Sequence, residues 1–111
     1  MSMDKVNYFD YLQKQIDAAK LQNQPIDRYV KKQISFLQDA HDEFIKRAEN
    51  EGYDLNSPTV GSIEIQQFSA MKNLAKQIGI PYEKYDRMIH DVRVRVFGEK
   101  GVKEYFQNDS I

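Results

Sequence analysis

The sequence predicts an all-α protein, a small helical bundle of four to five helices that forms a single domain over residues 1–111. Two observations support this prediction. Apolar residues recur at intervals of three and four in four separate segments, which is the period of one side of an α-helix. Helix-breaking residues are few, five Gly and three Pro, and Pro25, Gly52 and Gly79 fall between those segments.

The composition excludes several functional classes. The chain carries 16 Lys and Arg against 17 Asp and Glu, and it has no Cys. Disulfides, thiolate zinc sites and a cysteine nucleophile are therefore excluded. Seven Tyr, six Phe and a net charge of −1 argue against disorder, which requires low hydrophobicity and high net charge. Because the chain shows neither a long apolar run nor a signal-peptide pattern, we expect a soluble cytoplasmic protein that does not bind membranes.

Two long helices are expected in the N-terminal half. The first covers about residues 4–23, and Pro25 separates it from the second because proline disfavours the helical state in the residue before it. The second covers about residues 25–50, and Gly52 is placed to end it in the left-handed conformation. The apolar side of this second helix comprises Val30, Ile34, Leu37, His41, Phe44 and Ala48.

A helix–Gly–helix unit is expected in the C-terminal half. The third helix starts near Ser57-Pro58 or near Ser62, since either serine is a suitable N-cap, and it ends at Gly79. Pro81 fits the first position of the fourth helix, where its missing amide hydrogen costs nothing. The apolar side of this helix comprises Tyr82, Tyr85, Ile89, Val92 and Val96.

Residues 92–106 allow two interpretations. The alternation of Val and Arg over residues 92–97 has the period of a β-strand, and a four-residue loop at 98–101 would close a short C-terminal β-hairpin. Alternatively, the spacing of Tyr85, Ile89, Val92 and Val96 favours a continuing helix, followed by a short helix from about Glu99 to Gln107. We favour the helical interpretation, and the hairpin remains the alternative.

The segment MKNLAKQIGIPYEKYDRMI, residues 71–89, resembles the DNA-binding helix-turn-helix. The small Ala75 lets two helices cross closely, and Gly79 accepts the positive φ of the turn. Ile80 follows the turn, and Tyr85 and Met88 face inward on the second helix. This resemblance implies a small DNA-binding regulator as the alternative function. The residues expected to contact the groove and the phosphates are Tyr82, Lys84, Arg87, Arg93 and Arg95.

The charge distribution ranks protein partners above DNA. Residues 1–67 carry 8 basic and 11 acidic side chains, a net charge of −3, whereas residues 68–111 carry 8 and 6, a net charge of +2. A net charge of +2 is small for a surface that binds nucleic acid, which usually has a strongly basic face. Glu83 and Asp86 also lie among the expected DNA contacts, where they oppose the phosphate charge.

No residue pattern indicates catalysis, a cofactor or a metal. His41 lies on the apolar side of the second helix, which is typical of a packing residue. His90 lies 49 residues further on, and neither histidine belongs to a metal-ligand spacing. The chain has no Gly-rich phosphate loop and no nucleophile elbow. We therefore expect a protein that is not an enzyme and has no cofactor.

Aromatic residues indicate a protein interface. The tyrosines and phenylalanines are too many for the centre of a small core, and exposed aromatic side chains are typical of protein interfaces. The sequence therefore predicts an interaction protein that binds itself, most simply as a homodimer, or a protein partner. The expected interface residues are Tyr29, Phe36, Tyr105 and Phe106.

Overall fold

The chain folds into four helices and no strand within the part that the structure describes. The computed structural model describes the backbone of residues 5–106 and the side chains of residues 8–102. The all-α prediction is confirmed, with a count at the lower end of the expected range. The helices are α1 (Lys5–Leu21), α2 (Asp27–Asn50), α3 (Pro58–Gln77) and α4 (Glu83–Phe106).

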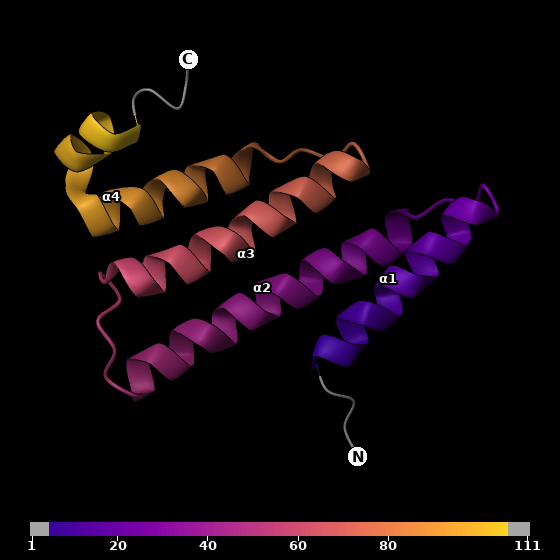
Figure 1. Cartoon of the computed structure of the whole chain (residues 1–111), viewed down its shortest axis with the longest axis horizontal. Helices are drawn as coiled ribbons and strands as arrows, with labels where there is room; N and C mark the ends of the chain where they lie inside the picture. Colours follow the sequence, from indigo (N-terminus) through magenta and orange to yellow (C-terminus); the bar gives the residue numbers. More distant parts are fainter. Residues whose placement is uncertain (1–4, 107–111) are drawn as a thin grey trace.

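The helices form an open bundle in which they lie side by side in one layer (Figure 1). The molecule measures 49 × 41 × 15 Å, and the view down its shortest axis shows the helices next to one another. Along the described chain α1 packs on α2, α2 on α3 and α3 on α4, and no other pair of helices is in close backbone contact. One layer has no second layer to cover it, so many apolar side chains remain half-buried.

Most helix ends occur where the sequence predicts them. Ser57 caps α3, because its Oγ accepts a hydrogen bond from the amide of Val60 at 3.2 Å, and Pro58 opens the helix. Gly79 has a φ of 71° and follows the end of α3. The expected start of the fourth helix at Pro81 is wrong, since α4 begins at Glu83. The Tyr82 amide instead donates to Oε2 of Glu83 at 3.0 Å, which fixes the turn before the helix.

The structure does not support the C-terminal β-hairpin. Residues 83–106 are helical except at Gly98, whose φ of 74° and ψ of 164° kink α4 into two helical segments. A positive φ of this size strains any residue that has a Cβ, so a glycine suits the kink. The result agrees with the other interpretation, a continuing helix followed by a short one from about Glu99.

The hydrophobic core lies around the inner side of α3. Phe68, Met71 and Ala75 are buried there, together with Tyr85 and Val92 of α4. Half-buried apolar side chains of α2 pack on the same cluster. The core therefore joins α2, α3 and α4, which fixes these three helices relative to one another. The end of the molecule where α2 turns into α3 lies outside this cluster, and Ala48 and Val60 are buried there.

Candidate functional site

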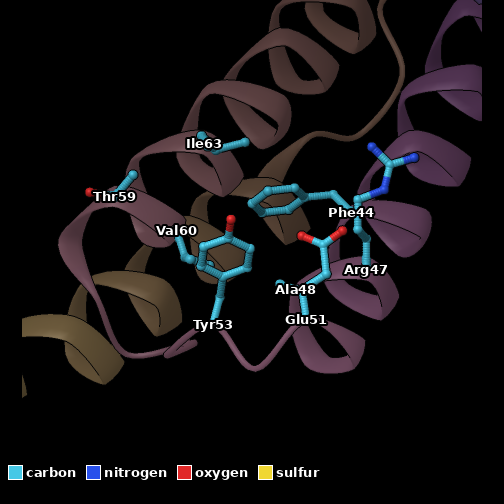
Figure 2. Close-up of a pocket in the computed structure, with 8 residues that line it drawn as sticks. All are labelled: Phe44, Arg47, Ala48, Glu51, Tyr53, Thr59, Val60 and Ile63. Atoms are coloured by element: carbon cyan, nitrogen blue, oxygen red, sulfur yellow. The ribbon is translucent and has the colours of Figure 1, made fainter.

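An apolar groove lies where α2 ends and α3 begins. Its cavity measures about 310 Å³ and is formed by the last turns of α2, the connecting loop and the first turns of α3 (Figure 2). Its lining residues are Phe44, Arg47, Ala48, Glu51, Tyr53, Thr59, Val60 and Ile63. A cavity of this size accepts one or two apolar side chains of a partner.

The end of α2 places Tyr53 in this groove. Gly52 has a φ of 76°, and its amide bonds to the carbonyl of Glu49 at 3.2 Å. The Tyr53 amide bonds to the carbonyl of Ala48 at 2.9 Å, which completes a Schellman motif. This motif folds the chain back against the helix that it has just left. The position of Tyr53 thus follows from the left-handed conformation of one glycine.

Exposed apolar side chains surround the groove. Tyr53 is 62% exposed and Ile63 is 37% exposed, and both border the same cavity. Figure 2 shows the Tyr53 ring beside the Phe44 ring, with Ile63 across the opening on α3. The guanidinium of Arg47 points away from these side chains. The groove therefore offers apolar contact at its centre and the two charges of Arg47 and Glu51 at its rim.

A charged cluster lies further along the same helices. The carboxylate of Glu64 on α3 is only 4% exposed and pairs with groups from both neighbouring helices. Nε2 of His41 on α2 lies 2.9 Å from Oε2 of Glu64, and Arg95 of α4 pairs with Oε1. The His41 ring also contacts Phe68, with 4.6 Å between ring centroids. Because three helices each contribute one member, the cluster fixes their register. Glu64 and Arg95 also line a hollow of about 280 Å³ between α3 and α4.

The sequence predicts the burial of one of the three members of this cluster. His41 is half-buried on the packed side of α2, as its place in the apolar pattern indicates. Glu64 and its pairing with Arg95 are missing from the prediction. A signal was present, since Glu64 lies four residues after Val60 and four before Phe68, on the apolar side of α3. A carboxylate at such a position requires a buried partner.

Two of the expected interface residues lie near α1. The Phe36 ring contacts the rings of Tyr8 and Phe9, with centroid separations of 5.9 and 5.8 Å. Tyr29 is half-buried, and the guanidinium of Arg28 lies 5.1 Å from the centroid of its ring. Phe36 is thus engaged within the chain, between α1 and α2. The roles of both residues in an interface stay predictions.

The other two expected interface residues, Tyr105 and Phe106, close α4. Their backbone is helical, but their side chains lie outside the described part of the structure. Neither aromatic pair coincides with the groove between α2 and α3. The sequence therefore predicts an aromatic interface but not the groove that Tyr53 and Ile63 border.

The helix–Gly–helix unit forms an antiparallel hairpin. Figure 1 shows α4 running back alongside α3. A Cβ built on Gly61, near the start of α3, would lie 2.7 Å from Cγ2 of Val96, so the two backbones approach closely far from the turn. The DNA-binding motif instead joins its helices at about 90–120°. Ala75 and Tyr85 are buried as expected, but the pair does not cross as the resemblance implies.

The residues expected to contact DNA interact with other side chains of this chain and do not form one basic surface. Lys72 and Lys76 lie over the Tyr82 ring, at 5.5 and 5.2 Å from its centroid. Arg93 is half-buried beside the contact of α3 with α4. Lys84 and Arg87 are exposed, yet they line one hollow of α4 together with acidic residues. The acidic members of that hollow are Asp86 and Asp91.

Arg95, the last expected DNA contact, pairs with Glu64 and so joins the charged cluster described above. A surface that alternates in charge attracts a polyanion less than a uniformly basic surface does. DNA binding by this chain stays a prediction.

Comparison of the chain with known protein families, curated proteins and solved structures finds no match. Within residues 5–106, no helix is long and apolar enough to cross a membrane.

Proposed function

We propose that this chain is a non-enzymatic protein-interaction module that binds an apolar helix side in the groove between α2 and α3. One observation carries the proposal: Tyr53, Ile63 and Phe44 gather around one cavity at the end of the molecule where α2 turns into α3. An exposed apolar cluster with a charged rim is typical of a protein-binding surface.

The shape of the groove favours a helical partner. On α2, the residues at 33, 36, 40, 44, 47 and 51 recur every three or four positions and so share one side of the helix. The first part of this side is covered by α1, since Gln33 bonds to Gln13 at 3.2 Å and Phe36 contacts α1. Phe44, Arg47 and Glu51 continue the same side beyond that contact. A partner helix placed there would follow the track of α1.

Site-specific photo-crosslinking tests this function. A photoreactive amino acid at Ile63 should form an adduct with a specific protein chain, and the same group at the exposed Asn73 on α3 should not. Excess unlabelled wild-type chain should suppress the adduct, whereas excess Ile63→Glu chain should not, because a charge in the groove opposes apolar contact. Absence of any suppressible adduct at position 63 would contradict the proposed function.

A further inference from the structure

We infer that the groove binds a second copy of this chain, with the C-terminal halves of the two α2 helices antiparallel about a two-fold axis. This inference rests on the proposed function and names its partner. Homodimers with two-fold symmetry are the commonest oligomers, and their interface must be complementary to itself. The groove meets that condition through its charges and through its one projecting aromatic ring.

The two charges at the rim are self-complementary. Arg47 and Glu51 are four residues apart on the groove side of α2. A two-fold axis that passes α2 at the level of residue 49 reverses the helix direction, so Arg47 of each copy meets Glu51 of the other. Both side chains are exposed, and neither has an ion-pair partner among the described residues. An unrelated partner would match this pair of charges only by coincidence, whereas a second copy carries the same pair in the reverse order.

The same axis supplies an occupant for the cavity. Tyr53 follows the end of α2, whereas Phe44 lies on the helix before that end, and both line the groove. Rotation about the level of residue 49 exchanges these two positions, which brings Tyr53 of each copy toward Phe44 of the other. Tyr53 is 62% exposed, so its ring has surface left to bury. Tyrosine suits this position because it buries much area at low entropic cost.

The size of the surface predicts a weak dimer. At ~1.5 Å per residue, the last three turns of α2 and the adjoining turns of α3 span roughly 16 Å by 20 Å, or roughly 300 Å². A stable interface buries about 800 Å² on each partner. The dissociation constant should therefore be on the order of 100 µM. The net charge of −1 on each chain adds little repulsion between the copies.

Sedimentation equilibrium of charge-swapped chains tests the two-fold pairing. The wild-type chain should dimerise over about 10 µM to about 1 mM at low salt. Arg47→Glu places only acidic groups at the rim, and Glu51→Arg places only basic groups there, so each variant alone should dimerise at least tenfold more weakly. An equimolar mixture of the two variants restores both opposite-charge contacts and should associate as the wild type does. The double variant should also dimerise.

A matched control uses the other side of α2. Lys46 and Glu49 are exposed and lie away from the groove side, so Lys46→Glu and Glu49→Lys make the same changes in charge without touching the groove. These variants should keep the wild-type dissociation constant. Circular dichroism of every variant checks that its helices remain folded.

These results distinguish the inferred partner, a second copy of the chain, from the proposed function, protein binding in the groove. A wild-type chain that stays monomeric at about 1 mM overturns the second copy. A dimer whose single variants are not rescued on mixing overturns it too, because the copies then meet elsewhere. In both cases an adduct from position 63 to a different protein preserves the proposed function. Absence of any adduct removes the proposed function, and rescue by mixing with an adduct to the same chain supports both.

Discussion

The two ends of α3 carry apolar residues at similar spacing but use them differently. Near the C-terminal end, Met71 and Ala75 are fully buried between α2 and α4. Near the N-terminal end, Ile63 is exposed beside the groove. Neighbouring helices cover the first end, whereas at the second end α4 packs closely on Gly61 and Ile63 is left beside the groove. Apolar periodicity therefore predicts which side of a helix is buried. How completely that side is buried depends on how far the neighbouring helices cover it.

Replacement of Met71 should give the largest loss of stability. Met71 is 0% exposed, so Met71→Ala leaves a cavity in the core and should lower the free energy of unfolding by about 3 kcal/mol. The matched change Ile63→Ala at the open end should cost less than about 1 kcal/mol, since part of that side chain already faces water. Urea unfolding followed by circular dichroism measures both. Equal losses would remove the distinction between the ends of α3.

Removal of the Glu64 carboxylate should give the next largest effect. Glu64→Gln takes a charge from His41 and Arg95 and should destabilise the chain by about 2 kcal/mol, because buried groups lose their partner. Glu49→Gln, on the exposed side of α2, should change the free energy of unfolding by less than about 0.5 kcal/mol. A double-mutant cycle with Arg95→Met should show that the two sites couple. Additive losses would mean that the ion pair does not link α3 with α4.

Gly52→Ala should give a smaller loss at the end of α2. The positive φ of Gly52 disfavours any Cβ, and no atom lies within 4 Å of the added group, so the cost is one of backbone conformation. We expect the free energy of unfolding to fall by about 1 kcal/mol. Gly52→Asn should cost less, because asparagine tolerates this conformation better. Thermal unfolding compares the two variants, and an alanine as stable as the wild type would contradict the Schellman assignment.

Ile63→Gln should give the smallest change in stability and a clear change in association. We expect the free energy of unfolding to change by less than about 0.5 kcal/mol, since the side chain already borders solvent. Self-association should nevertheless weaken, because a polar group replaces an apolar contact in the groove. Ser62→Gln, at the neighbouring exposed position, should leave both quantities unchanged. Denaturant unfolding and sedimentation equilibrium give these values, and parallel losses in both would indicate a purely structural residue.

Local signals in the sequence predict most of the fold. Ser57-Pro58, Gly52 and Gly79 mark helix ends through capping and positive φ, which depend on a few neighbouring residues. The start of the fourth helix is missed because Glu83 bonds back to the Tyr82 amide before the helix begins. The hairpin alternative fails because the period-two pattern at 92–97 also fits a helix, and packing of Val92 and Val96 near Gly61 favours the helix.

The candidate site depends on information that the sequence carries only indirectly. Phe44, Tyr53 and Ile63 belong to different local segments, and no short-range rule brings them together. The expected aromatic residues Tyr29 and Phe36 lie instead along the α1 side of the molecule. Exposure of an apolar residue is a property of its neighbours, so periodicity alone does not identify it.

By itself, the sequence determined the helical content, the positions of the turns and the inner side of each helix, because these follow from propensity, capping and period. Only the tertiary structure decided that the helices form one layer, that Glu64 joins His41 to Arg95, and that a groove stays open beside Tyr53. The physical reason is the distance along the chain over which each interaction acts. Caps and periods act over a few residues, whereas burial and charge pairing depend on which distant segments meet.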